Sequence, residues 1–174
     1  MINSIFLGTR LEALEALKRY FKVELILTKK GSWVYNKYKD SKINIMLIDK
    51  TNKSEIFDFL SKIEATLMLS AGFPYILPRE VFSSDAVLLN SHPSILPSYK
   101  GYNAIKDALS YGEEKLGVTM HYMTEDLDAG EIIFQEQVSI KNLQIEDIYQ
   151  LLFSVVEPFV ITKGLEIIGN KHFR

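Results

Sequence analysis

Short apolar segments alternate with amphipathic helical segments along the first half of the chain, and this alternation limits the folds it can adopt. The apolar runs at 4–7, 23–28, 43–49 and 65–72 are typical of buried strands. Between them, leucine recurs at 11, 14 and 17, and apolar residues stand at 56, 57, 59, 60 and 63, which is helical spacing. Because parallel strands need crossover helices, the pattern predicts an α/β fold with a doubly wound, mostly parallel sheet flanked by helices.

The rest of the chain fits one such unit. We expect a loop over the polar, aromatic stretch 29–42, and a long covering helix over 145–169, kinked near Pro158 because proline cannot donate the helical hydrogen bond. Within 174 residues there is no repeat or low-complexity tract. The sequence therefore predicts a single domain over residues 1–174.

Charge and composition exclude several classes of protein. The net charge of −2 lacks the positive field that captures phosphate backbones, so we expect no nucleic-acid partner. The absence of cysteine removes thiolate chemistry and favours the reducing cytoplasm. The first ten residues lack a basic segment and a long apolar run, and no run approaches the roughly 18 residues that cross a bilayer. We predict a cytoplasmic protein with no membrane partner.

Asn90 ends the predicted apolar strand 86–90, and His92 follows it two residues later. In open α/β sheets, ligands bind outside the carboxyl ends of the strands. Pro93 favours an extended His92, and alternation then points Asn90 and His92 to the same side. The alternative is structural, with Asn90 satisfying loop backbone groups and His92 on the surface beside a turn.

A second polar group stands in and after the apolar segment 117–123. His121 lies within this predicted strand, where a histidine is usually just a hydrogen-bonded member of a half-buried face. The following loop carries Glu125, Asp126 and Asp128 before Gly130. Since Asp and Gly are turn formers, a solvated acidic turn explains this loop as well as a functional role does.

Two longer motifs resemble a known family. "NSHPSILPSYKG" (90–101) and "GVTMHYMTEDLDAGEII" (117–133) are similar to the paired signature of the 10-formyltetrahydrofolate-dependent formyltransferases, and "GFPYILPREV" (72–81) resembles their folate-contacting segment. The resemblance implies a Rossmann-like formyltransferase fold, with 10-formyltetrahydrofolate as formyl donor and a small-molecule amine as acceptor.

The resemblance also assigns roles to residues. The catalytic positions of the family fall on Asn90, His92 and Asp128, with His121 as catalytic support; its folate contacts fall on Tyr75, Ile76, Leu77, Met123 and Thr124. Asn90 and His92 would stabilise the oxyanion of the tetrahedral intermediate. Asp128 would move the proton from the attacking amine to the departing folate nitrogen.

The loop after the first strand bears on the acceptor. Glycinamide ribonucleotide enzymes of the family carry a Gly-x-Gly-Ser-Asn loop that holds phosphate, whereas this chain reads "LGTRLEAL". Thr9 and Arg10 are the candidates for acceptor binding, and Thr9 is alternatively the N-cap of the next helix. The Gly-Thr pair is closer to methionyl-tRNA and sugar N-formyltransferases. Because the chain lacks the RNA-gripping barrel of the tRNA enzymes, we predict the amino group of a nucleotide-linked aminosugar as acceptor.

Alternatives remain at this point. Phosphoribosylglycinamide or methionyl-tRNA formyltransferase activity is the nearest. A metal-dependent hydrolase could use His92, His121, Asp126 and Asp128 as ligands, although we expect no metal. A catalytically inactive folate-binding module is the third, and the sequence leaves the oligomeric state open.

Overall fold

The computed structural model describes residues 3–172, with side chains as far as residue 170. Contacts between Cα atoms group the chain into two compact units, the first ending at Leu89 and the second beginning at Asn90. The single domain that the sequence indicates over 1–174 stays a prediction. None of the described helices combines the length and apolar character needed to cross a bilayer.

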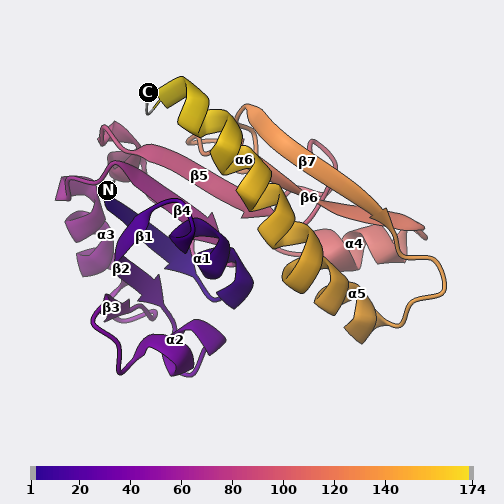
Figure 1. The fold of residues 1–174 in the computed structure, drawn as a ribbon, viewed down its shortest axis with the longest axis horizontal. Helices are drawn as coiled ribbons and strands as arrows, with labels where there is room; N and C mark the ends of the chain where they lie inside the picture. Colours follow the sequence, from indigo (N-terminus) through magenta and orange to yellow (C-terminus); the bar gives the residue numbers. More distant parts are fainter. Residues whose placement is uncertain (1–2, 173–174) are drawn as a thin grey trace. The chain divides into compact units, whose positions relative to one another are not determined.

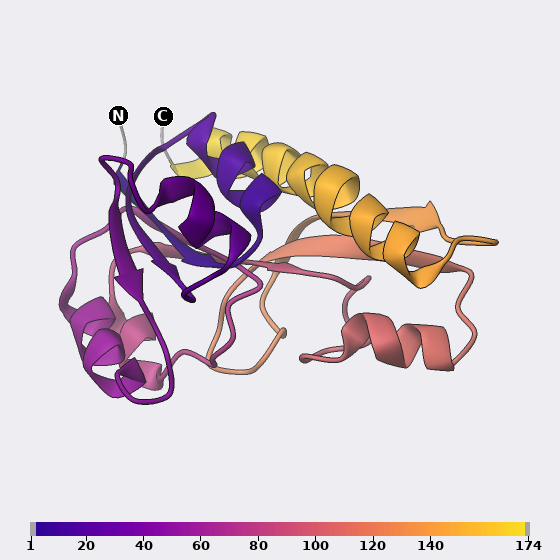
Figure 2. The same ribbon diagram turned by 90° about the horizontal axis from the view of Figure 1, so that it is seen from below.

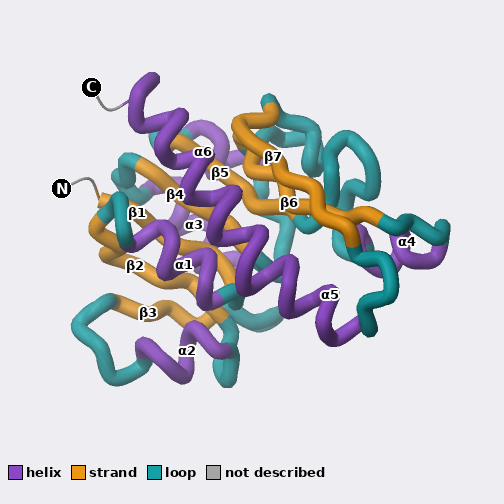
Figure 3. Tube along the Cα trace, turned by 45° about the vertical axis from the view of Figure 1, so that its right-hand side comes forward, coloured by secondary structure: helices purple, strands orange, loops and turns teal. Residues whose placement is uncertain are grey.

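The first unit is a parallel sheet with helices on both faces. Its elements are β1 (Asn3–Gly8), α1 (Leu11–Lys18), β2 (Lys22–Thr28), α2 (Trp33–Tyr38), β3 (Asn44–Leu47), α3 (Lys53–Lys62), β4 (Leu67–Ala71) and the 3-10 helix η1 (Arg79–Ser83). Its strands are ordered β3-β2-β1-β4. The central strands β1 and β4 are almost entirely buried, and α1 and α3 lie on opposite faces of the sheet (Figures 2 and 3). The apolar runs and the helical spacing therefore have the structure that they predict.

Helix α2 lies where the sequence predicts a loop. Ser32 precedes it and accepts a hydrogen bond from the Tyr35 amide (3.0 Å), which satisfies one N–H group of the first turn. Val34 and Tyr38, four residues apart, are its buried residues. Because β2 and β3 pair in parallel, the chain needs a crossover between them, and α2 is part of it.

The second unit combines an antiparallel strand pair with helices on both sides. Its elements are β5 (Val87–His92), which enters it from the first unit, α4 (Ala104–Ser110), β6 (Lys115–Tyr122), β7 (Ile132–Ser139), α5 (Ile145–Leu151), the π-helical segment η2 (Leu152–Val156) and α6 (Glu157–His172). Figure 2 shows α4 on one side of β6 and β7, with α5 and α6 on the other.

The strand pairing and the length of β5 test two predictions made from the sequence. Strands β1, β2, β3 and β4 pair in parallel and β6 pairs antiparallel with β7, so the predicted α/β class with a mostly parallel sheet is confirmed. Strand β5 continues two residues beyond its predicted end at Asn90. His92 is therefore the last residue of a strand and shares the regular alternation of Asn90.

The irregularity in the C-terminal helix precedes Pro158. Residues 152–156 form a π-helical segment between α5 and α6, and Figure 1 shows α5 and α6 as an almost continuous rod. Proline has no N–H to offer the carbonyl four residues earlier, and its ring crowds that carbonyl. A widened turn before Pro158 accommodates this, so the helix has a π segment instead of the predicted kink.

Helix α6 packs against β6 through a close approach at Gly164. A Cβ atom there would overlap Sδ of the fully buried Met120. The rings of Phe134 on β7 and Phe159 on α6 add an edge-to-face contact, with centroids 6.0 Å apart. These contacts fix α6 on the rear face of the strand that carries His121.

The two glycines of α6 provide a matched test of this packing. We expect Gly164→Ala to lower the free energy of unfolding by about 1–3 kcal/mol, because it overpacks a filled core. Gly169→Ala has nothing within 4 Å of the new Cβ and should raise it by up to about 1 kcal/mol, through helix propensity alone. Urea unfolding measures both. Equal effects of the two substitutions would contradict the close contact.

Candidate active site

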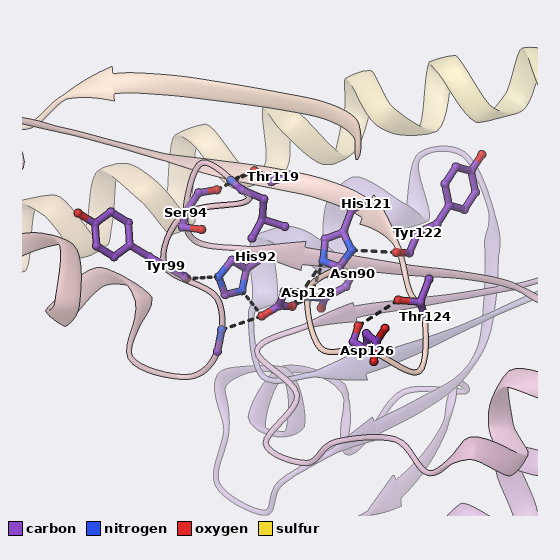
Figure 4. Close-up of polar contacts among 12 residues, drawn as sticks. Asn90, His92, Ser94, Tyr99, Thr119, His121, Tyr122, Thr124, Asp126 and Asp128 are labelled. Carbon is purple, nitrogen blue, oxygen red and sulfur yellow. Dashed lines mark hydrogen bonds and ion pairs between the residues drawn. The ribbon is translucent and has the colours of Figure 1, made fainter. Parts of the chain in front are cut away.

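Four polar side chains converge within the second unit, from the end of β5, from β6 and from the loop after β6. Figure 4 shows Asn90, His92, His121 and Asp128 pointing toward one another. Asn90 and His92 alternate along β5 and therefore face the same side, as predicted, while Ser91 faces the other. His121 comes from β6 and Asp128 from the loop that connects it to β7.

A tight loop brings Asp128 to this position. Asp128 has φ 49°, in the left-handed region that aspartate tolerates better than most residues. Gly130 then packs so closely on the Tyr122 carbonyl that a Cβ would overlap it. The "LDAG" sequence thus supplies an aspartate where the backbone is left-handed and a glycine where the backbones touch.

The Asp128 carboxylate collects four contacts. Asn90 Nδ2 donates to Oδ1 (3.2 Å), and His121 Nε2 lies 3.5 Å from the same oxygen. The Gly101 amide donates to Oδ2 (2.8 Å), and His92 Nδ1 lies 3.3 Å from it. The carboxylate side chain is only 5% exposed. It is therefore a buried anion whose two oxygens are both satisfied.

These contacts decide its charge state. Burial raises the pKa of the Asp128 carboxyl, but the hydrogen bond with His121, the Gly101 amide and the positive charges of His92 and His121 outweigh burial. The pKa of Asp128 therefore lies below its ordinary value of 3.8. At neutral pH, the group is an ionised carboxylate.

His92 lies between two hydrogen-bond acceptors. Its Nε2 is 2.8 Å from the Tyr99 carbonyl oxygen, and its Nδ1 faces Asp128. A carbonyl and a carboxylate can only accept, so both contacts are hydrogen bonds when both ring nitrogens carry protons. The surroundings of His92 therefore favour the imidazolium form.

His121 is held in a different way. Its Nδ1 lies 2.8 Å from the Tyr122 carbonyl oxygen and must donate to it. Its Nε2 is 3.1 Å from Asn90 Nδ2, from which the neutral ring accepts a hydrogen bond. In the protonated ring, the same nitrogen donates to Asp128. In either state, His121 buttresses the pair formed by Asn90 and Asp128.

A buried threonine ties the two motif segments together behind the site. Thr119 Oγ1 on β6 donates to the Ser94 carbonyl (2.7 Å) and accepts from the Leu96 amide (3.2 Å). Figure 4 shows this link beside the catalytic candidates. The loop after His92 is thereby anchored to the strand that carries His121.

Some parts of the site escaped the sequence reasoning. The Tyr99 carbonyl faces His92 because Tyr99 adopts φ 55°, and the Gly101 amide reaches Asp128. Only the glycine of the "LPSYKG" motif signals this turn. Tyr102 is another residue of the site that the sequence did not indicate. Burial and the negative charge of Asp128 raise the pKa of its phenol. Tyr102 is 66% exposed, and its raised pKa keeps the phenol protonated at neutral pH.

The predicted folate contacts fall in both units. In the first, the Tyr75 ring packs edge-on against Phe73 (centroids 6.0 Å apart), Ile76 is 57% exposed and Leu77 is buried. In the second, Met123 and Thr124 begin the loop that carries Asp128, and Thr124 Oγ1 donates to the Asp126 carbonyl (3.0 Å). Their role in folate binding stays a prediction.

In the loop after β1, Thr9 is not the N-cap of the next helix, which was the alternative to a role in acceptor binding. The N-cap of α1 is Arg10, and Thr9 Oγ1 donates to the Gly72 carbonyl (3.2 Å) instead. Thr9 therefore joins the ends of β1 and β4, because the left-handed Gly8 lets the chain pass close to Ala71. The roles of Thr9 and Arg10 in acceptor binding stay predictions.

The metal-dependent hydrolase alternative requires His92, His121, Asp126 and Asp128 as metal ligands. Among residues 3–170, no group of three or more His, Asp or Glu side chains is arranged to hold a metal ion. Asp126 is exposed and distinct in environment from the buried Asp128. The two nitrogens of His92 face acceptors, so the cluster is organised as a hydrogen-bonded site.

Comparisons with known proteins agree on one family. A family model described as formyl transferase matches residues 17–156. The trifunctional purine biosynthetic protein adenosine-3 of Chironomus tentans is 38% identical over 117 residues, covering 66% of this chain and 8% of that protein. The methionyl-tRNA formyltransferase of Thermotoga maritima is 35% identical over 100 residues, covering 57% of this chain and 32% of that protein. The chain thus spans about a third or less of the length of these relatives.

Solved structures extend the likeness over nearly the whole chain. The phosphoribosylglycinamide formyltransferase of Bacillus halodurans superposes with a TM-score of 0.79 at 25% identity, covering 99% of each chain. A formyltetrahydrofolate deformylase from Pseudomonas syringae has a TM-score of 0.79 at 23% identity, covering 94% of this chain and 60% of that one, which shows a shared fold. The Rossmann-like formyltransferase fold predicted from the sequence is confirmed.

The lowered pKa of Asp128 predicts a pH-dependent contribution to stability. A carboxyl group whose pKa is lower in the folded than in the unfolded chain stabilises the fold when ionised. This contribution is complete above the unfolded value and is lost as the pH falls through the folded value, below 3.8. Wild type should therefore be more stable than Asp128→Asn at pH 7 and 5, and the difference should shrink at pH 3. Urea unfolding at the three pH values measures it, and a constant difference would contradict the assignment.

Proposed function

Because the chain belongs to the formyl transferase family, as its two motifs predict, we propose that it transfers a formyl group from 10-formyltetrahydrofolate to a primary amine. The family assignment made from the sequence is confirmed, and the reaction class of that family is folate-dependent formyl transfer. The observation that carries the proposal is the convergence of an amide, an imidazole and a carboxylate from separate segments.

The chemistry assigns each of these groups a task. The amine nitrogen attacks the formyl carbon, a new C–N bond forms, and the carbonyl oxygen takes up negative charge. Asn90 Nδ2 and the imidazolium of His92 both donate toward Asp128, and in this scheme they share these hydrogen bonds with the oxyanion as its charge develops. As the intermediate collapses, the bond from carbon to the folate nitrogen breaks and tetrahydrofolate leaves.

Asp128 handles the proton in this scheme. The attacking amine loses a proton and the departing folate nitrogen gains one, so a base that is ionised at neutral pH is required. The lowered pKa of Asp128 keeps it ionised, and its contact with His92 also favours the imidazolium form that this scheme assigns to oxyanion stabilisation. His121 supports both by holding Asn90 and Asp128.

For the acceptor, the comparisons favour the alternatives over our main prediction. The relatives and solved structures cited above that transfer formyl groups are named for purine biosynthesis, glycinamide ribonucleotide or methionyl-tRNA, and none of them for a sugar nucleotide. Glycinamide ribonucleotide is our first candidate, because the structural likeness to the phosphoribosylglycinamide formyltransferase covers 99% of both chains. Methionyl-tRNA is the second, because Gly8-Thr9 stands in place of the purine enzymes' phosphate loop. The aminosugar becomes the third.

An acceptor panel tests this ranking. The protein is incubated with 10-formyltetrahydrofolate and glycinamide ribonucleotide, charged methionyl-tRNA or a nucleotide-linked aminosugar, and release of tetrahydrofolate is followed together with formylation of the amine. We expect formylation of glycinamide ribonucleotide to be fastest. Tetrahydrofolate released without any amine would instead indicate hydrolysis, and no release under any condition would indicate a folate-binding module.

The catalytic assignment predicts large losses of turnover without unfolding. Asn90→Ala and His92→Ala should each lower kcat by about 100- to 1000-fold, because each removes a donor to the oxyanion. Asp126→Asn is the matched control: it removes an exposed carboxylate from the same loop as Asp128 and should leave kcat unchanged. Steady-state kinetics and circular dichroism separate activity from folding. Full activity of either alanine variant would refute the assignment.

A further inference from the structure

A buried carboxyl group touches β5 on the face opposite the candidate active site. Ser91 Oγ donates to Glu157 Oε1 over 2.7 Å, and Ser91 is 3% and Glu157 0% exposed. Ser91 belongs to the end of β5 and Glu157 is the first residue of α6. The formyl-transfer scheme above uses neither side chain.

A carboxyl group with no exposed surface is costly to bury. No free helix terminus offsets this cost, because the Glu157 backbone N–H donates to the Leu152 carbonyl within the continuous helical rod. Replacing both partners of a buried hydrogen bond by apolar groups of the same shape can be nearly neutral for stability. Stability alone therefore gives little reason for Glu157 to occupy this position, and its contact with Ser91 suggests another one.

Ser91 stands between the two oxyanion donors. Because successive side chains of a strand alternate, a force that fixes Ser91 on the rear face also fixes the directions of Asn90 and His92 on the front face. We propose that Glu157 is a positioning residue for formyl transfer, which holds Ser91 so that Asn90 and His92 stay aligned with Asp128. This inference rests on the proposed function for its catalytic consequence, but not for its geometry.

Helix α6 is well placed for such a role. Its Gly164 packs directly on Met120, the residue before His121, so the helix is fixed against β6. Its first residue meanwhile holds the residue before His92. One rigid helix thus contacts both strands of the site from behind, each at the position next to a functional histidine. A small displacement of a catalytic group can cost up to about 100-fold in rate.

Three substitutions separate positioning from charge. Ser91→Ala and Glu157→Leu both remove the hydrogen bond, and each should lower kcat about 10- to 100-fold with an unchanged KM for 10-formyltetrahydrofolate. The double variant should lose no more than either single one, because both remove the same contact. Glu157→Gln keeps an oxygen that accepts from Ser91, and its kcat should stay within about twofold of wild type.

The control removes a buried hydroxyl elsewhere. Ser4 is 1% exposed and donates to the Lys22 carbonyl in the first unit, so Ser4→Ala should leave kcat unchanged. All variants are assayed at a temperature where circular dichroism shows them folded. An unchanged kcat in Ser91→Ala, a raised KM as the sole effect, multiplicative losses in the double variant, or a Glu157→Gln as impaired as Glu157→Leu would each overturn the proposal.

A readout without catalysis separates this inference from the proposed function. The NMR signals of the His92 ring are assigned by their absence from the spectrum of His92→Gln. We expect these signals to shift in Ser91→Ala and Glu157→Leu but not in Ser4→Ala. If the wild type transfers no formyl group, the proposed function fails, and the His92 signals still decide whether Glu157 positions the end of β5. Unshifted signals in both variants would overturn the proposal.

Discussion

The site depends on one buried anion. Asp128 gathers an amide hydrogen from Asn90, a backbone hydrogen from Gly101 and two imidazole rings around a carboxylate that is almost fully removed from water. Such a charge is tolerated only when donors and positive charge surround it. The same electrostatic requirement that satisfies Asp128 therefore holds β5, the loop before α4 and β6 in one arrangement, which contains the donors that the proposed formyl transfer would use.

The chain's motifs carried most of this information, because the site is built from short segments with strong local rules. Alternation placed Asn90 and His92 on one side of a strand, and the structure extends that strand to include both. Asp128 was separable from Asp126 only through the family resemblance, since both are turn-forming residues of one loop. The left-handed backbone of Asp128 and the contact of Gly130 with Tyr122 explain why the two carboxylates end in different surroundings.

What could not be predicted arises from contacts between distant segments. Helix α2 was not predicted, because its segment is polar in composition. Its N-cap Ser32 and the buried pair Val34 and Tyr38 are the sequence features that indicate it. The hydroxyl of Thr9 turned to Gly72 because β1 and β4 are neighbours, a fact that no local pattern contains. Glu157 lies within an apolar helical run, and only its meeting with Ser91, 66 residues away, gives it a meaning beyond the helix.

The π-helical segment before Pro158 sets the rotational phase of the C-terminal rod. Each residue of an α-helix turns the chain by about 100°, and the wider i→i+5 turn takes up one extra residue, so the same residues wound as regular α-helix would swing everything downstream around the helix axis. Glu157 would then leave Ser91, and Gly164 would no longer meet Met120. The wide turn thus lets α6 keep both contacts while α5 continues the same rod.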